Sequence, residues 1–367
     1  MAPRSVKVLV AGGGPAGSAA AAVLGRAGAD VLLVEKDLSF AKPCGGGVPA
    51  PAFREFGLPE ECAKHRIGTV RLVAPSGRFV DIRLAEDIFI VERGEFDAHL
   101  RGIARGSGAE VVEADLLSVE KTGKRCLVRL RQGRDETSCE AEYVIAADGV
   151  NSRVRASLGM RPAASDTIFA LTGRFAGAAT DRCEFWFSRD LAPGMYAWIF
   201  PGGSGVSLGA GGPDAAALRV RLSRFRERAG LTGDPESTRM YRIPVWRDGP
   251  YHRGNVLFCG DAAGQVMPLS YEGIYYAMKA GACAAEAVLS GNAAGYRKRW
   301  KAEFGRIFLL ASKMNAYFLR DDASAERLVA LHERPEVQAI AQDLWLYKRH
   351  RGRHLLGYVR QIGKLFR

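Results

Sequence analysis

The chain has 367 residues, of which 47% are hydrophobic and 25% charged, an ordinary composition for a globular protein. This length exceeds what one small core needs and favours two domains, or two with an appendage. No apolar run reaches the roughly 18 residues of a membrane span, and no cleavage pattern follows the first apolar stretch. We therefore expect a cytoplasmic protein.

The positive charge gathers near the C-terminus. The net charge is +12, and the chain from Arg297 onward carries 16 Lys and Arg against 7 Asp and Glu. From Leu344, apolar and aromatic residues alternate with Lys348, Arg349, Arg351, Arg353, Arg360 and Lys364. This basic amphipathic pattern predicts either contact with an anionic membrane surface or a helix that packs on the protein itself. No nucleic-acid-binding module accompanies the charge, so we do not expect a nucleic acid partner.

The cysteines are odd in number and form no CxxC or Cys/His cluster. The seven are Cys44, Cys62, Cys126, Cys139, Cys183, Cys259 and Cys283. We therefore expect no disulfide framework, zinc site, iron–sulfur cluster or other metal site.

A strand–turn–helix–strand pattern opens the chain. The apolar run 6–11 leads into Gly12-x-Gly14-x-x-Gly17 and a helix-prone segment, and a second apolar run ends at Glu35. In such a unit the first glycine permits the tight turn, the second lets the backbone approach a pyrophosphate, and the third lets helix and strand pack closely. Glu35 would accept hydrogen bonds from a ribose. The pattern predicts a dinucleotide-binding βαβ unit.

The remaining periodicities indicate further helices and strands. Helical spacing is found over residues 94–106, 214–229, 273–289 and from 295 to the end. Strand patterns cover residues 67–85 (a hairpin around Pro75-Ser76-Gly77), 111–119, 126–130, 143–147, 168–175, 184–187, 195–200, 205–208 and 255–259. There are no internal repeats.

Two later motifs also follow strand patterns. Asp148-Gly149 comes after the run 143–147, and Gly260-Asp261 comes after the run 255–259. An aspartate after a strand-end glycine can bind a ribitol hydroxyl. The helix that begins near Gly273 can direct its positive dipole end at the pyrimidine edge of a flavin.

The three motifs in this order resemble the flavoprotein group of aromatic hydroxylases, flavin halogenases and geranylgeranyl reductases, over about residues 1–290. The resemblance implies FAD in the Rossmann-type site and an α/β fold: a Rossmann-like FAD-binding domain, a β-sheet substrate domain and a helical C-terminal region. We expect the FAD-binding domain at 1–66, 86–160 and 251–290, the substrate domain at 67–85 and 161–250, and the helical region at 291–367. Only one GxGxxG is present, so no second Rossmann domain for NAD(P)H is implied.

The same resemblance implies a set of cofactor contacts. Arg93, just before Glu95-Phe96-Asp97, matches the arginine that reaches FAD in this group; the alternative is a surface arginine at a helix start. The residues expected at the cofactor are Gly12, Gly14, Ala16, Gly17, Glu35, Lys36, Cys44, Gly45, Gly47, Arg93, Leu116, Asp148, Gly260, Asp261, Gly273 and Ile274.

Two stretches are similar to geranylgeranyl reductases in particular. The segment from Lys42 to Pro49 resembles that family's Cys-Gly loop beside the flavin, where glycines would let the backbone approach the ring. Cys44 in this loop is our catalytic candidate. It would tune the flavin or deliver a proton, and the alternative is a packed structural thiol.

The second stretch resembles the reductases' YxWxFP signature. Here it reads Tyr196-Ala197-Trp198-Ile199-Phe200-Pro201. Alternate residues of a strand share a face, so the three aromatics predict one wall of a substrate site, or plain core packing. One position departs from the family: Tyr271 stands before Glu272-Gly273-Ile274, where a small residue is usual. Its phenol would narrow the substrate cavity or contribute a hydroxyl.

The resemblance implies reduction of carbon–carbon double bonds in a prenyl chain of a lipid, quinone or pigment precursor. Reduced flavin would supply hydride, with NAD(P)H or a ferredoxin as electron donor. Three alternatives stay open: a monooxygenase, a halogenase, and a non-catalytic flavin- or lipid-binding protein. Halogenases usually carry WxWxIP, and this chain has Tyr196 and Phe200 at two of those places.

Overall fold

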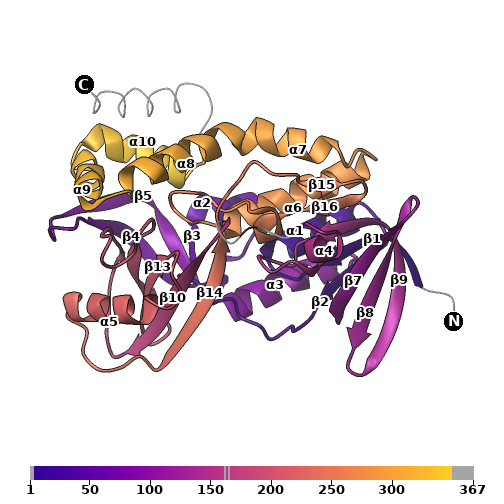
Figure 1. Cartoon of the computed structure of the whole chain (residues 1–367), viewed down its shortest axis with the longest axis horizontal. Helices are drawn as coiled ribbons and strands as arrows, with labels where there is room; N and C mark the ends of the chain where they lie inside the picture. The colour runs from indigo at the N-terminus through magenta and orange to yellow at the C-terminus, as the bar shows by residue number, and fades with distance from the viewer. Residues whose placement is uncertain (1–3, 161–162, 164–165, 349–367) are drawn as a thin grey trace. The chain divides into compact units, whose positions relative to one another are not determined.

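The computed structural model describes residues 4–160, 163 and 166–348 (Figure 1). The chain forms two compact units, each assembled from three separated segments. The first unit comprises Met1–Ala41, Gly94–Thr167 and Ile243–Phe308, and the second comprises Lys42–Arg93, Ile168–Arg242 and Leu309–Arg367. Most of the basic segment predicted to meet a membrane or pack on the protein lies beyond residue 348, outside the described residues.

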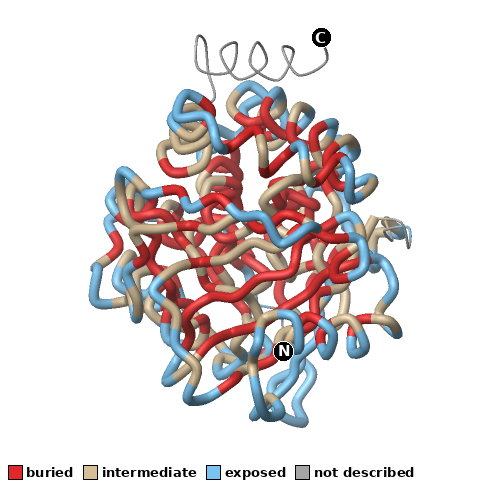
Figure 2. The backbone as a smooth tube through the Cα atoms, turned by 90° about the vertical axis from the view of Figure 1, so that its left-hand side faces the viewer, coloured by how far each residue is buried: buried red, intermediate tan, exposed pale blue. Residues whose placement is uncertain are grey.

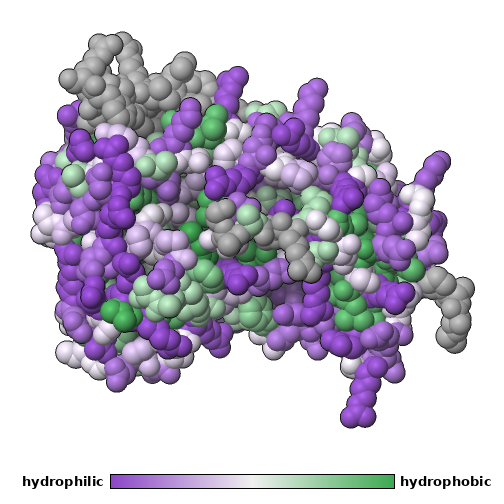
Figure 3. Space-filling view, viewed as in Figure 1, coloured by the Kyte–Doolittle hydropathy of each residue, from purple (hydrophilic) through white to green (hydrophobic). Residues whose placement is uncertain are grey.

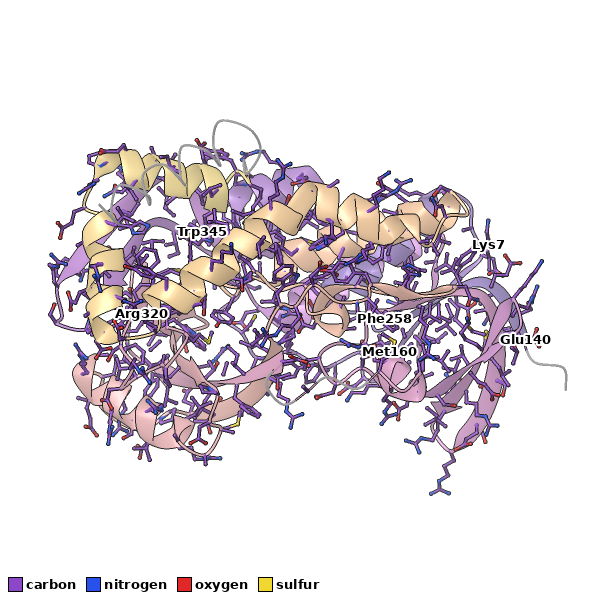
Figure 4. All side chains as sticks on the ribbon, turned by 45° about the horizontal axis from the view of Figure 1, so that its top comes forward. Lys7, Glu140, Met160, Phe258, Arg320 and Trp345 are labelled. Carbon is purple, nitrogen blue, oxygen red and sulfur yellow. The ribbon has the colours of Figure 1, made fainter. Side chains whose placement is uncertain are left out.

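A parallel sheet forms the core of the first unit. Its central strand β1 (Arg4–Ala11) pairs in parallel with β2 (Val31–Glu35) and with β9 (Asp135–Ala146). Further parallel neighbours are β6 (Glu110–Glu113) beside β2 and β16 (Val256–Phe258) beside β9. Val8, Leu9 and Val10 are fully buried, as expected for a strand covered on both faces. Phe258, labelled in Figure 4, is likewise buried at the end of β16.

The helices of this sheet include α1 (Pro15–Arg26), α3 (Arg93–Gly106) and α6 (Ile274–Leu289). Small residues bring α1 and α6 into close contact, because a Cβ atom on Gly281 would lie only 1.9 Å from the carbonyl oxygen of Ala16. Shorter elements are α4 (Arg153–Ser157), the 3-10 turn η3 (Gly260–Ala263), α7 (Gly295–Trp300) and the π-turn η4 (Lys301–Gly305).

An antiparallel extension continues this sheet. β9 also pairs with β8 (Arg125–Gln132), and β8 pairs with β7 (Asp115–Thr122). The short β15 (His252–Arg253) pairs with β16. The single strand expected over residues 111–119 is therefore two strands, β6 and β7. They are separate because β6 pairs in parallel with β2, whereas β7 forms an antiparallel hairpin with β8. The apolar pattern alone does not show which strand a segment will pair with.

The second unit is built on one large sheet of mixed direction. Its strand order is β14-β10-β13-β12-β11-β4-β5-β3, and β4 and β11 run parallel. The strands are β3 (Gly47–Pro49), β4 (Ala63–Val73), β5 (Phe79–Val91), β10 (Thr167–Ala176), β11 (Cys183–Trp186), β12 (Ala197–Gly202), β13 (Gly205–Gly212) and β14 (Ser237–Pro244). The helix α2 (Ala50–Phe56) and the 3-10 turn η1 (Glu60–Cys62) connect β3 to β4.

Helices cover this sheet, and β11 shows how its two faces divide. Neighbouring residues of a strand point to opposite faces. Trp186 packs against Phe225 of α5 (Leu218–Arg228), with ring centroids 5.5 Å apart. Phe185 instead meets Trp345 of α10 (Pro335–Trp345), with ring centroids 6.3 Å apart. Trp345 is labelled in Figure 4. The other helices at the C-terminal end are α8 (Arg306–Phe318) and α9 (Asp322–Leu331).

The unit boundaries differ from the expected domain boundaries. Residues 42–66 and 86–93 lie in the second unit, residues 291–308 lie in the first, and the described residues after 308 lie in the second. The reason is strand pairing: β4 and β5 pair from Ala63↔Val91 to Val73↔Phe79, and β3 joins the outer edge of β5. The chain therefore enters the second sheet well before residue 67.

Burial and hydropathy follow this architecture. In Figure 2 the buried segments run through the interior strands and helices while the exposed ones lie at turns and outer helix faces. In Figure 3 hydrophilic residues cover much of the face shown, with smaller hydrophobic areas among them. Within the described part of the chain, no helix combines the length and apolarity needed to cross a membrane. Across those same residues, no group of His, Cys, Asp and Glu side chains could hold a metal ion.

Candidate functional site

The three motif glycines between β1 and α1 have different surroundings. Gly12 has a φ of +98°, and a Cβ atom there would lie 2.4 Å from the carbonyl oxygen of Ala147. A Cβ atom on Gly17 would lie 1.8 Å from the carbonyl oxygen of Gly12. At Gly14 no heavy atom lies within 4 Å of the Cβ position, so the space beside the start of α1 is open. Gly12 and Gly17 thus serve the fold, while Gly14 leaves room for a ligand.

Glu35 is tied directly to this turn. One of its carboxylate oxygens accepts a hydrogen bond from the Gly13 N–H at 2.7 Å. The half-buried carboxylate therefore stands at the end of β2, beside the glycine turn, as the sequence predicts for a ribose acceptor. Lys36, the next residue, is exposed.

The three motifs meet at the start of α1. The Cβ position of Gly12 is 3.0 Å from the Cα of Asp148, and that of Gly260 is 3.0 Å from the Cβ of Ala16. The turn after β9 and the turn after β16 therefore flank the glycine turn. Parallel strands bring their carboxyl ends to one edge of a sheet, which is where open α/β sheets bind ligands.

Asp148 carries an unused acceptor. Its Oδ2 accepts the Val154 N–H at 3.1 Å, while its Oδ1 is buried with no hydrogen-bond partner among residues 4–160, 163 and 166–348. Burial raises the pKa of this carboxyl group. A buried acceptor normally has a partner, so a bound group that donates a hydrogen bond fits this position.

Arg155 joins the Asp148 turn to the turn after β16. Its Nη1 donates to the carbonyl oxygen of Ala262 at 3.0 Å, and burial lowers the pKa of its guanidinium group. Arg153, two residues earlier, donates to the carbonyl oxygen of Leu116 at 3.1 Å. Leu116 itself is buried on β7.

The start of α6 provides a second helix N-terminus without a side-chain cap. Gly273 is the N-cap residue, and Ile274 begins the helix with its side chain buried. The Cβ position of Gly273 is 3.8 Å from Oδ1 of Asp261, so this carboxylate lies beside the helix start. Gln265, which the sequence analysis missed, accepts the Gly260 N–H at 2.9 Å and holds the turn.

Tyr271 occupies a conformation that is unfavourable for its residue type. Its φ is 51°, in the left-handed region that non-glycine residues seldom adopt. The loop holds it there: the Tyr271 N–H donates to the Met267 carbonyl at 2.9 Å, and the Met267 N–H donates to the Glu272 carbonyl at 3.1 Å. Strain of this kind costs on the order of 1–3 kcal/mol and persists where the surrounding structure imposes it.

These features fit a dinucleotide with a pyrophosphate group. Helix α1 also lacks a side-chain cap at its N-terminus. The first N–H groups of both α1 and α6 can therefore donate hydrogen bonds to a bound anion. The residues that would hold the cofactor are Gly14 and α1 for the pyrophosphate, Glu35 for a ribose, and Asp261 with the start of α6 for the flavin half.

In the second unit, Cys44 and Arg93 meet. Nη1 of Arg93 donates to the sulfur of Cys44 at 3.6 Å, and Arg93 is only 8% exposed. The backbone of the loop that carries Cys44 is bonded to the end of β5. The Val91 N–H donates to the Gly46 carbonyl at 3.0 Å, and Gly46 has a φ of +74°. Arg93 is therefore a buried residue and not the surface arginine of the alternative reading.

The glycines after Cys44 have a reason within this unit that the sequence analysis did not foresee. A Cβ atom on Gly45 would lie 2.4 Å from the ring of Phe200, and one on Gly46 would lie 2.4 Å from the carbonyl oxygen of Val91. Gly47 begins β3 and has the same ring 3.9 Å from its Cβ position. Approach to a flavin is therefore not needed to explain glycine at residues 45 and 46.

The predicted aromatic residues form one cluster. Phe185 of β11 lies between Tyr196 and Phe200, with centroid distances of 4.9 and 5.2 Å, and Tyr196 meets Trp198 at 6.3 Å. All three predicted residues are at least nine-tenths buried. We call Phe185, Tyr196, Trp198 and Phe200 the aromatic face.

Trp198 has a glycine opposite it. It pairs with Gly209 of β13, where a Cβ atom would lie 2.0 Å from the indole ring. Its Nε1–H is buried and has no hydrogen-bond partner in the described part of the chain.

Besides Gln265, four residues important to this geometry were not predicted from the sequence. Phe185 was detectable, because it alternates correctly in the strand predicted over residues 184–187. Gly209, Gly281 and Arg101 gave no signal, because each depends on a contact with a residue far away in the sequence.

The comparisons with known proteins agree with this geometry. Residues 5–294 match the model of the FAD binding domain family. The chain is 32% identical to the chloroplastic geranylgeranyl diphosphate reductase of Oryza sativa subsp. japonica, over 94% of this chain and 82% of that protein. It is 30% identical to digeranylgeranylglycerophospholipid reductase 2 of Methanopyrus kandleri, over 89% of each chain.

A solved structure extends the likeness to the fold. The geranylgeranyl bacteriochlorophyll reductase-like protein of Thermoplasma acidophilum superposes with a TM-score of 0.85 at 25% identity, over 98% of this chain and 99% of that one. The α/β fold with a second, β-sheet unit is thereby confirmed. The chain belongs to the geranylgeranyl reductase family of FAD-dependent oxidoreductases.

Proposed function

We propose that this protein reduces isolated carbon–carbon double bonds in the prenyl chain of a lipid, quinone or pigment precursor. The observation that carries the proposal is the position of the Cys44 loop against the aromatic face: Gly45 packs directly on the ring of Phe200. A potential proton donor and a wall suited to an apolar chain thus occur together in the second unit. The names of the relatives, which refer to geranylgeranyl and digeranylgeranyl compounds, support a substrate of this class.

Each part of the protein has a distinct role in this proposal. When bound, reduced FAD supplies the hydride for one alkene carbon. The sulfur of Cys44 holds the proton for the other carbon, and Arg93 orients that sulfur through its hydrogen bond. The aromatic face provides apolar contact along the prenyl chain and excludes water. Hydride and proton together add H₂ to the double bond, and the thiol recovers its proton from solvent.

The first unit holds the cofactor in this proposal. Gly14 and the N-terminus of α1 receive the pyrophosphate, and Glu35 accepts from a ribose hydroxyl. Arg93 belongs to the second unit, where it orients Cys44, and the family resemblance also implies it as an FAD contact. Because general acid assistance typically contributes about 100- to 10,000-fold, the pair Cys44 and Arg93 is the first place to look for catalysis.

The test is a single turnover in which dithionite replaces the biological electron donor. The holoprotein is reduced anaerobically with dithionite and mixed with geranylgeranyl diphosphate, a digeranylgeranyl glycerophospholipid and a prenylated quinone. The products are read by mass, and at least one substrate should gain H₂ per reduced bond while the flavin is reoxidised. Dithionite makes the result independent of whether NAD(P)H or a ferredoxin is the natural donor.

Other outcomes identify the alternative functions. NAD(P)H-dependent oxygen uptake with an oxygenated or halogenated product would replace the proposal by a monooxygenase or halogenase. Purified protein that carries no flavin and does not bind added FAD would indicate a non-catalytic binding protein. A flavin-loaded protein that leaves every prenyl substrate unchanged would contradict the proposal.

A further inference from the structure

Arg101 is buried in the first unit without an acidic partner. It lies on α3, is only 4% exposed, and donates to two main-chain carbonyl oxygens, that of Gly13 at 3.2 Å and that of Leu38 at 2.7 Å. Among residues 4–160, 163 and 166–348 it forms no ion pair with a carboxylate. Burying a charge is unfavourable unless another group compensates it, so this arginine requires an explanation.

The two carbonyls belong to two loops that follow neighbouring parallel strands, β1 and β2. Gly13 belongs to the glycine turn before α1, and Leu38 belongs to the loop after β2. The Leu38 N–H is also fixed, since it donates to Glu113 at 2.9 Å. Arg101 therefore holds the loop that follows Glu35 against the glycine turn.

The Gly13 residue is held from three sides. Its N–H donates to Glu35 at 2.7 Å, and its carbonyl accepts from Arg101 and from Ser18 Oγ at 3.0 Å. A side chain at this position has no room, because a Cβ atom would lie 2.9 Å from the Arg101 side chain and 3.1 Å from the Glu35 Cβ. These contacts within the protein fix the backbone conformation of the glycine turn.

This arrangement has a consequence for the next N–H group. A trans peptide directs its carbonyl and its N–H to opposite sides. Because Arg101 and Ser18 draw the Gly13 carbonyl toward themselves, the N–H of Gly14 in the same peptide points the other way. The open space at Gly14 and the uncapped start of α1 belong to this turn.

We propose that Arg101 is the positioning residue of the adenylyl half of the FAD site. It fixes the Gly13–Gly14 peptide so that α1 presents its N–H groups to the pyrophosphate, and it fixes the loop at Leu38 beside the ribose acceptor Glu35. Its charge, which no bonded carboxylate cancels, also favours the pyrophosphate dianion. The inference rests on the FAD part of the proposed function and not on alkene reduction.

The experiment measures cofactor binding to the apoprotein in the absence of substrate. Dissociation constants for FAD, ADP and FMN are determined for wild type, R101M, R101K and R105M. Arg105 is the matched control, because it lies one turn further along α3 and is exposed. ADP represents the adenylyl half with the pyrophosphate, whereas FMN lacks the adenylyl group.

R101M should bind FAD and ADP about 10- to 100-fold more weakly, the range for losing hydrogen bonds from a charged group. R101K keeps the charge but cannot span both carbonyls, so its constants should fall between those of R101M and wild type. FMN binding should change less than twofold in every variant, and R105M should match wild type throughout.

A role in stability alone would lower the unfolding temperature of the apoprotein without separating ADP from FMN. ADP binding within twofold of wild type in folded R101M would overturn the proposal, as would equal losses for ADP and FMN. If R101M does not fold, R101K decides, and wild-type ADP affinity in that variant would overturn it. Because no substrate is present, failure here leaves alkene reduction untouched, and failure of alkene reduction leaves this result standing.

Discussion

The guanidinium group of Arg93 donates a hydrogen bond to the sulfur of Cys44, 3.6 Å away, across 49 residues of sequence. The two residues were singled out for different reasons, one as a cofactor contact and one as a proton donor. Their contact makes them one functional unit in the proposed mechanism. The hydrogen bond from the guanidinium group can fix the orientation of the Cys44 side chain. A thiol exposed to solvent has no such fixed orientation.

The first prediction tests this pair by a double-mutant cycle. Cys44→Ala should retain FAD and slow alkene reduction in a single turnover by about 100- to 10,000-fold, because a positioned acid is lost. Cys44→Ser should recover part of the rate. Arg93→Met should slow wild type by about 5- to 100-fold but have much less effect in the Cys44→Ala background, since coupled residues are not additive.

Two results would contradict this prediction. Full single-turnover reduction by Cys44→Ala would make Cys44 a packing residue and leave water, or Tyr271, as the donor to examine. Strictly multiplicative effects of the two substitutions would mean that Arg93 acts on the cofactor alone.

The second prediction concerns the indole of Trp198 and the glycine opposite it. Gly209→Ala should push the indole out of place, because the new methyl group would lie 2.0 Å from the ring. Overpacking of this kind costs about 1–3 kcal/mol of stability. Both Gly209→Ala and Trp198→Ala should raise the KM for the prenyl substrate or change how many double bonds are reduced, without lowering FAD affinity.

Trp198→Phe and Gly102→Ala are the controls. Phenylalanine keeps a ring on the aromatic face and removes an N–H that has no protein partner in the described residues, so catalysis should be nearly unchanged. Gly102 is exposed on α3 with free space around its Cβ position, and alanine there should stabilise the protein by about 0.4–1 kcal/mol. A normal product pattern in Trp198→Ala would remove this residue from the substrate site.

The third prediction is a pH dependence of stability. His332, at the end of α9, is buried, and its Nδ1 lies 2.8 Å from the Leu328 carbonyl oxygen. Burial lowers the pKa of the imidazole below its usual 6.5, so the folded protein favours the neutral ring. The unfolded chain then binds more protons near and below that pH, and the contribution of His332 is fully present above about pH 6.5 and declines as the pH falls.

Chemical unfolding at pH 7.5 and pH 5.5, of wild type and of His332→Asn, checks this. Asparagine retains a donor near the position of Nδ1 but does not titrate. The free energy of unfolding should fall more in wild type, by up to about 1.4 kcal/mol per pH unit below the normal histidine pKa. Equal losses in the two proteins would assign the pH dependence to other groups.

The fourth prediction concerns the basic C-terminal segment, which lies mostly outside the described residues. If it contacts membranes, co-sedimentation with liposomes should require anionic lipid and decline as salt rises, because the Debye length falls to about 3 Å at 1 M. Removal of residues 349–367 should abolish sedimentation while FAD binding persists. Equal binding to neutral and anionic liposomes, or no binding at all, would favour a segment that packs on the protein.

Much of the first unit was readable from the sequence because its signals are local. Gly12, Gly14, Gly17 and Glu35 lie within one βαβ unit, where each residue type meets a backbone or hydrogen-bonding need of that unit. The later turns at Asp148 and Gly260 also follow strands. Parallel pairing then brings all three to one edge, so chain order was sufficient to predict their meeting.

The second unit was decided by pairing across long sequence distances. From the sequence, residues 42–66 are expected in the FAD-binding domain. They lie in the second unit because β3 and β4 both pair with β5. Tyr196, Trp198 and Phe200 could be placed on one face from their alternation alone. Strand register decides that Phe185 lies among them and that Gly209 makes room for Trp198. A short sequence pattern does not reveal this register.

The sequence by itself determined the residue types of the nucleotide turn, because those requirements act over a few neighbouring residues. The order of its three motifs and their resemblance to a known flavoprotein group indicated the class of protein and the cofactor. Only the tertiary structure decided that Arg93 reaches Cys44, that Gly45 lies on Phe200, and that Arg101 holds Gly13. Each of these depends on two side chains or backbones brought together by folding, and packing in a dense interior admits one arrangement among many that the same local patterns would allow.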